Sequence, residues 1–307
     1  MKECVDAFVA HAKEKDLHVL YCQTRENGEV SNYWSRFSVL TRMESWSLSK
    51  TFVAMGVGIA LDEGLLTLDE KVADSFPELV YDVNNPNALD ITVENMLTMT
   101  TGLADPLFFR DHPERKTVRD WGRHFYTKGD FVRRPGEAFL YSNFNTYMLG
   151  CLVEKKCGQN ICEYMRYRLF EPLGMGNANM TTCPHGHTVA ANGLEINVDE
   201  MGRFAQMLLQ KGVYNGKRIV SEKFVEKSLS PIVGTGKRTS APDSQHRLDY
   251  GYQTWVDTEW DCCFLWGIFG QYCVLFPERN IVVGVLSLEE DSNAVGRLLW
   301  KDVITQI

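Results

Sequence analysis

Residues 47–61 read SLSKTFVAMGVGIAL, in which a serine precedes a lysine by three positions at the start of an apolar helix. This spacing places Ser47 and Lys50 on one helical face, within reach of each other. A serine hydroxyl becomes a nucleophile when a neighbour takes its proton, and a partly desolvated lysine can help to do so. The helix N-terminus also favours an oxyanion. By itself the pattern fits better a helix-capping serine followed by a solvated lysine, because serine and lysine are common residues.

The composition is that of a globular protein with a large core. The chain has 307 residues, of which 44% are hydrophobic and 23% charged, so it suits one large domain or two closely packed ones. Its net charge of −8 is spread along the chain, which disfavours a nucleic acid or an anionic membrane as partner. No apolar run approaches membrane-spanning length. A soluble enzyme is expected, and its oligomeric state is left open.

The cysteines point to a reducing compartment. Nine of them are scattered along the chain without a paired framework. Residues 1–12 form an amphipathic pattern with acidic residues and lack the basic-then-apolar order of a signal peptide. Reduced thiols and a cytoplasmic location are therefore expected.

Strand patterns lie near both ends of the chain, and helical patterns lie between them. The strands are expected at 17–22, 30–39, 262–268, 272–277 and 281–288. The helices are expected at 47–64, 93–99, 118–127, 145–155, 162–170, 197–209 and 293–304. This order predicts a sheet formed by both termini and interrupted by a helical insert. In a single unit over 1–307, the α/β part would cover about 1–66 and 186–307, and the helical part about 67–185.

A second pattern, Tyr141-Ser142-Asn143, lies in a loop that opens a helix. A phenol and a carboxamide two residues apart in a loop can both point into one cleft. With the serine–lysine pair, this segment makes the chain resemble the serine hydrolases of the class C β-lactamase, penicillin-binding-protein and esterase superfamily, whose motifs include S-x-x-K and Y-x-N. Taken alone, the segment also fits a turn with a helix N-cap.

Further segments resemble that superfamily in the same order along the chain. They are 91–103 (ITVENMLTMTTGL), 170–175 (FEPLGM), 192–204 (NGLEINVDEMGRF) and 250–255 (YGYQTW). The resemblance covers about residues 40 to 290. It implies an α/β (α+β) fold of β-lactamase type, with an antiparallel sheet built from both chain ends, flanking helices and a helical insert.

The resemblance also implies roles for the residues of the two motifs. Ser47 would attack a carbonyl and form an acyl-enzyme. Lys50 and Tyr141 would share its proton, with a charged lysine favouring the phenolate so that the tyrosine can act as base; which of them is the base stays open. Asn143 would hold the substrate and keep the lysine in place. Backbone N–H groups of Ser47 and of the strand at Gly267 would bind the oxyanion.

The third motif of the superfamily is incomplete in residues 263–271, which read CFLWGIFGQ. Aligning Gly267 with the motif glycine puts Leu265 where the superfamily often has lysine or histidine, and makes Ile268 the second oxyanion donor. A register shifted by one residue puts Trp266 there instead. Either way the cation is missing, and with it a charge-assisted hydrogen bond worth roughly 1.5–3 kcal/mol. A small ester, amide or peptide is therefore a better candidate substrate than a β-lactam or a D-Ala-D-Ala peptide.

Other interpretations stay open. A catalytically idle relative that binds a ligand or partner in the cleft fits the incomplete motif and Met99, where the superfamily has histidine. Residues 183–187 read CPHGH, which looks like part of a metal site. No second ligand pair stands at zinc-finger spacing from it, so a surface loop is expected, with no metal and no cofactor. Several residues of the helical part can line the substrate cleft or belong to that part's own core: Asp105, Phe108, Phe109, Trp121 and Phe125.

Overall fold

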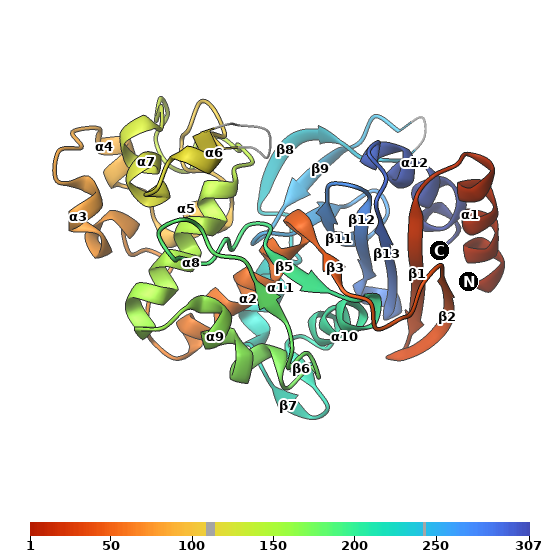
Figure 1. The fold of residues 1–307 in the computed structure, drawn as a ribbon. Coiled ribbons are helices and arrows are strands. Elements are labelled where there is room, and N and C mark those ends of the chain that lie inside the picture. The colour runs from red at the N-terminus through yellow and green to blue at the C-terminus, as the bar shows by residue number, and fades with distance from the viewer. Residues whose placement is uncertain (109–113, 242–243) are drawn as a thin grey trace.

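An antiparallel sheet formed by both ends of the chain lies at the centre of the fold. The computed structural model describes residues 1–108, 114–241 and 244–307. Among these residues, the main sheet has eight strands in the order β2-β1-β13-β12-β11-β10-β9-β8, with every neighbouring pair antiparallel (Figure 1). The strands are β1 (Val19–Glu26), β2 (Glu29–Ser35), β8 (Val233–Arg238), β9 (Arg247–Tyr250), β10 (Trp255–Asp257), β11 (Cys262–Gly267), β12 (Gln271–Phe276) and β13 (Ile281–Ser287). The N-terminal β1 pairs with the C-terminal β13, which confirms the predicted sheet.

Helices cover both faces of the sheet. Successive residues of a strand point to opposite faces, and they belong to two separate hydrophobic clusters. On β12, Cys273 and Leu275 belong to one cluster, and Val274 between them belongs to the other. The first cluster contains residues of α2 and α10; the second contains residues of α1 and α12, which pack on each other (Figure 1). These helices are α1 (Lys2–Glu14), α2 (Ser49–Asp62), α10 (Val198–Leu209) and α12 (Ser292–Asp302).

The middle of the chain forms the predicted group of helices, which gathers beside the sheet at the left of Figure 1. They are α3 (Pro77–Val80), α4 (Pro86–Leu89), α5 (Val93–Leu97), α6 (Glu114–Thr117), α7 (Trp121–Lys128), α8 (Asn143–Cys157) and α9 (Ile161–Met165), which a π-helical turn at Arg166–Phe170 extends. The longest of them, α8, packs against α2. Thus α2, which carries Lys50 and begins just after Ser47, lies between the sheet and these helices. No helix in the described ranges is both long enough and apolar enough to cross a membrane.

Residues 210–261 contain structure that the sequence patterns did not predict. Besides β8, β9 and β10, this part holds α11 (Glu222–Ser228) and a small hairpin of β6 (Val213–Tyr214) and β7 (Lys217–Arg218). Strand β8 reads VGTGKR, and its two glycines and two cations conceal any alternation of apolar residues. Strand β10 is only three residues long. Outside this part of the chain, a three-stranded sheet joins β3 (Met43–Glu44), β5 (Leu194–Ile196) and β4 (Asn179–Met180).

Candidate active site

Ser47 lies in a 3₁₀ turn, η1 (Trp46–Leu48), that leads directly into α2. Trp46 has a φ of 52°, a left-handed conformation that costs a non-glycine residue energy and is common at functional sites. The N-cap of α2 is Leu48 and makes no side-chain capping hydrogen bond. Ser47 is therefore not the helix cap that the isolated pattern allowed. Ser47 is half-buried at the start of a buried helix.

Lys50 is buried, with 1% of its surface exposed. Its Nζ lies 3.1 Å from Ser47 Oγ, 2.8 Å from Asn143 Oδ1 and 2.8 Å from the carbonyl oxygen of Ala191. Burial lowers the pKa of Lys50 well below its ordinary value, and the charge of Arg115 lowers it further. The solvated lysine that the isolated pattern allowed is thereby excluded.

The three partners of Lys50 fit a neutral amine. Two of the oxygens, Asn143 Oδ1 and Ala191 O, can only accept hydrogen bonds, so they take the two amine hydrogens. The nitrogen lone pair is then left for the third partner, the hydroxyl of Ser47. In its neutral form, Lys50 can therefore accept the proton of the Ser47 hydroxyl, whereas its ammonium form would donate to all three oxygens.

Tyr141 lies on the other side of this pair. Its side chain hydrogen-bonds with Ser47, and its ring centroid is 5.0 Å from Lys50 Nζ. Burial raises the pKa of Tyr141 above its ordinary value, an effect that the hydrogen bond to Ser47 partly offsets. The electrostatics thus differ from the expectation that a charged lysine favours a tyrosine phenolate. Burial thus disfavours both charged forms, the ammonium of Lys50 and the phenolate of Tyr141.

Ser142, the middle residue of 141–143, is the N-cap of α8, so the helix cap that was expected as an alternative role for this segment is present. Ser142 Oγ accepts from Phe144 N at 3.2 Å, which caps α8, and donates to Pro106 O at 2.8 Å. Its neighbours Tyr141 and Asn143 are consequently free to turn toward Ser47 and Lys50.

The sequence offered five residues of the helical part as a lining of the substrate cleft or as core, and four of them fall in the described ranges. Of these, Phe108, Trp121 and Phe125 are buried in the core, and the backbone of Phe108 accepts from Asn143 Nδ2 at 3.4 Å. Phe109 lies outside the described residues.

The end of β11 approaches the serine turn. A Cβ at Gly267 would lie 2.5 Å from the carbonyl oxygen of Ser45, so only glycine lets the strand come this close. Ile268 follows in the turn between β11 and β12. Gln271 braces that turn by donating from Nε2 to the carbonyls of Ile268 (3.2 Å) and Ser287 (2.6 Å). The predicted oxyanion-binding strand therefore lies next to Ser47.

Comparison with known proteins agrees with this geometry. The family model described as Beta-lactamase matches residues 6–304. The chain belongs to the beta-lactamase family. The predicted relationship to the β-lactamase and penicillin-binding-protein serine hydrolases is thus confirmed, together with the predicted fold class.

Individual relatives in the beta-lactamase family are distant. Protein flp of Staphylococcus aureus (strain NCTC 8325 / PS 47) is 26% identical over 160 residues, or 52% of this chain and 32% of that protein. Penicillin-binding protein 4* of Bacillus subtilis (strain 168) is 27% identical over 141 residues, or 44% and 29%. These matches cover about a third of the length of the curated relatives.

Solved structures share the fold of this beta-lactamase family member. The octameric penicillin-binding protein homologue from Pyrococcus abyssi has a TM-score of 0.77 and 19% identity, covering 99% of this chain and 77% of that one. The penicillin-binding protein from Bacillus halodurans has a TM-score of 0.72 and 17% identity, covering 94% and 97%.

A lysine from another strand lies beside the third motif, which itself lacks a cation. Leu265 is 1% exposed and packs in the core cluster that contains α2 residues. Lys237 of the unpredicted strand β8, however, places its Nζ 3.9 Å from the ring centroid of Trp266 and 5.0 Å from that of Trp255. The Trp255 ring in turn stacks on Tyr141 at 5.5 Å. The third motif on β11 thus lacks a cation, as expected, and Lys237 of β8 lies beside its Trp266.

Lys237 is a residue that the sequence analysis missed. As a whole it is exposed, but the two indole rings shield its ammonium, and this desolvation lowers the pKa of Lys237 to about 8. Nothing in the local sequence marks it, because no strand was predicted there. The carbonyl of Ala191 was missed for a different reason: a backbone acceptor leaves no side-chain pattern.

Proposed function

We propose that the protein is a serine hydrolase that forms an acyl-enzyme at Ser47 on an ester, an amide or a small peptide. The position of Lys50 Nζ, buried and 3.1 Å from Ser47 Oγ, carries this proposal. The neutral amine takes the hydroxyl proton while Oγ bonds to the substrate carbonyl carbon. The backbone N–H groups of Ser47 and Ile268 stabilise the resulting oxyanion. The proton then passes to the leaving group as the scissile bond breaks.

Deacylation repeats these steps with water as the nucleophile. Water loses a proton to the amine of Lys50, attacks the acyl carbon and releases the acid, while Oγ of Ser47 regains a proton. The phenol of Tyr141, which keeps its own proton, can donate a hydrogen bond to Oγ and relay the proton toward the leaving group. No cofactor takes part in this scheme.

We favour a neutral ester or amide over a β-lactam as substrate. The side chains beside the catalytic group are largely aromatic, with Trp255 stacked on Tyr141 and Trp266 next to it. Aromatic neighbours suit an apolar substrate group better than a charged one, and β11 itself offers no cation for a substrate carboxylate.

A second candidate, a carboxylate-bearing peptide or a weakly hydrolysed β-lactam, is supported by Lys237. Its ammonium stands beside the same tryptophans as a possible anion partner. Substitution of Lys237, described below, separates the two candidates.

The test of the proposed function is labelling with a fluorophosphonate probe, which reacts with activated serines. Wild type should be labelled, Ser47→Ala should not, and Ser49→Ala should retain the label, since Ser49 Oγ donates to Trp46 O at 2.7 Å and stays outside the proton path. Turnover of p-nitrophenyl esters should follow the same pattern. Equal labelling of wild type and Ser47→Ala would favour the idle, ligand-binding alternative instead.

We also propose a cytoplasmic location. All nine cysteines are free thiols in the structure, seven of them buried, which suits a reducing compartment. Fractionation of cells that express the chain would test this.

A further inference from the structure

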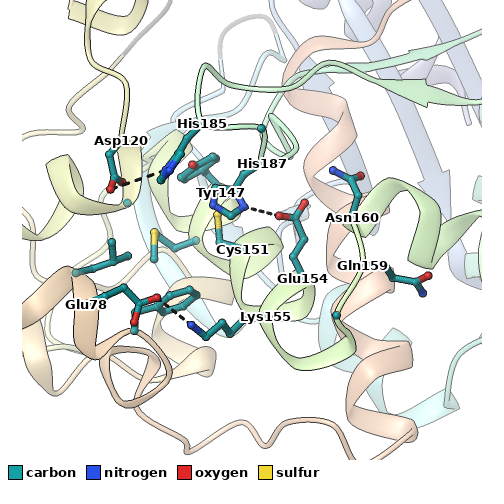
Figure 2. A pocket seen from close by; sticks show the side chains of 16 residues that line it. Glu78, Asp120, Tyr147, Cys151, Glu154, Lys155, Gln159, Asn160, His185 and His187 are labelled. Atoms are coloured by element: carbon teal, nitrogen blue, oxygen red, sulfur yellow. Dashed lines mark hydrogen bonds and ion pairs between the residues drawn. The ribbon is translucent and has the colours of Figure 1, made fainter.

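A pocket lies in the helical part of the molecule, apart from Ser47 and Lys50 (Figure 2). It has a volume of about 710 Å³ and is bordered by residues of α3, α7, α8 and the loop at 183–187. An ion pair between Lys155 and Glu78 (2.9 Å) lies on one wall, and His185 approaches Asp120 on another. Neither Ser47 nor Lys50 is among the described residues that line it. The pocket is therefore distinct from the proposed catalytic site.

Three metal-binding side chains converge on the wall of this pocket. Cys151 and Glu154 are three residues apart on α8, so they share one helical face. His187 reaches them from the loop, with Nδ1 2.7 Å from Glu154 Oε2. The sulfur, one carboxylate oxygen and one ring nitrogen all lie within 4.8 Å of one another. Figure 2 shows the Cys151 sulfur and the Glu154 carboxylate both directed toward the His187 ring.

The carboxylate of Glu154 is held in place by its other oxygen. Oε1 accepts from Thr188 N (3.1 Å), from Thr188 Oγ1 (2.8 Å) and from Ile161 N (3.2 Å). These contacts leave Oε2 directed at the cluster. Neighbouring hydrogen bonds of this kind fix the orientation of metal ligands.

We propose that Cys151, Glu154 and His187 form a Zn²⁺ site. A thiolate, an imidazole and a carboxylate are the donors that zinc uses in proteins, and three protein ligands leave a fourth tetrahedral position for water from the pocket. On binding, the Cys151 thiol gives up its proton to solvent, and metal bonds replace the hydrogen bond between His187 and Glu154. The site joins α8 to the loop that leads to Ala191, whose carbonyl contacts Lys50.

The loop at 183–187 is exposed at Pro184, His185 and Gly186, as expected. The expected surface loop is partly buried, since Cys183 is 4% exposed and hydrogen-bonds through Sγ with Tyr147 OH at 3.4 Å. The missing second ligand pair comes from a helix, at a spacing of three and without any zinc-finger signature. The proposal thus departs from the expectation that the chain holds no metal. A simpler reading makes the contact of His187 with Glu154 an ordinary ion pair and Cys151 a bystander.

Zinc titration of the chelator-treated full-length protein distinguishes the two readings. We expect about one equivalent to bind with a dissociation constant below about 1 µM, and the melting temperature to rise with it. Cobalt(II) in place of zinc should give a thiolate-to-metal charge-transfer band and the visible bands of tetrahedral coordination. Ser47→Ala should bind zinc like wild type, because the site does not depend on the proposed catalysis.

Variants assign the ligands. Cys151→Ser should abolish the charge-transfer band, and His187→Gln and Glu154→Gln should each weaken zinc binding at least about tenfold. Two controls, Cys162→Ser on α9 and His185→Gln in the same loop, should keep wild-type affinity. If Cys151→Ser does not fold, the two glutamine variants decide. Absence of stoichiometric binding, a charge-transfer band that survives in Cys151→Ser, or unchanged affinity in both glutamine variants would overturn the proposal.

Discussion

Lys50 and Lys237 both lose hydration near the same cleft, but their surroundings differ. Lys50 Nζ faces three oxygen atoms, including Ser47 Oγ, and burial takes its pKa well below the ordinary value. Lys237 Nζ faces two indole rings, and its pKa falls only to about 8. Ring faces attract the charged ammonium, whereas the oxygens around Lys50 also suit an amine with a free lone pair. This difference supports the proposed role of Lys50 as a base and of Lys237 as a cation.

The largest expected effect comes from removing one amine or the other. Lys50→Met should lower kcat/KM for a neutral ester by about 10²–10⁴-fold, the usual contribution of a general base. Lys237→Met removes the same chemical group and should change that value less than about threefold, because it touches no reacting atom. Both are measured with p-nitrophenyl esters, with melting temperatures as a check on folding. Similar losses in the two variants would contradict the division of roles.

Disturbing the close approach of β11 to the turn that carries Ser47 should lower kcat nearly as much as the loss of Lys50. In Gly267→Ala the new Cβ meets the Ser45 carbonyl at 2.5 Å, so the strand must move and the oxyanion site must open. Loss of one oxyanion donor predicts a fall in kcat of about 10²–10³-fold. Gly234→Ala on β8 is the matched control, because its Cβ would find only Asp249 Oδ1 at 3.7 Å. Wild-type kcat in Gly267→Ala would mean that β11 does not supply the donor.

The smallest effect concerns substrate charge. If Lys237 pairs with a substrate carboxylate, Lys237→Gln should lower kcat/KM for a carboxylate-bearing ester about tenfold more than for its neutral counterpart. The ammonium loses its proton as pH rises through about 8. The wild-type preference for the anionic ester should therefore decline above that pH and be flat in the variant. Equal losses for the two esters would remove the second candidate function.

The sequence predicted the parts of the site that lie on regular helices. Lys50 and Asn143 lie on α2 and α8, whose helices were predicted, and the resemblance to the superfamily implied that Asn143 keeps Lys50 in place. Lys237 was out of reach, because the six residues of β8 show no alternation and pair only in the finished sheet. Cys151 was hidden differently: inside a buried helix a cysteine looks like any small apolar residue.

The pKa values of Lys50 and Tyr141 could not be predicted from the sequence either. A lysine next to a tyrosine suggested an ammonium that favours the tyrosine phenolate. Burial changes the outcome, since it raises the pKa of Tyr141 and lowers that of Lys50. Sequence spacing can bring two groups together, but the solvent they lose depends on the whole fold.

The measurement that tests the central claim most directly is the rate of acyl-enzyme formation against pH, followed by intact-protein mass spectrometry after rapid mixing with an activated ester. The adduct should map to Ser47, and its rate should rise with pH to a plateau as Lys50 loses its proton, with a midpoint well below the ordinary lysine pKa of 10.5. Lys50→Met should show neither the fast rate nor this rise. An adduct on another residue, or the same pH-dependent rise in Lys50→Met, would contradict the account.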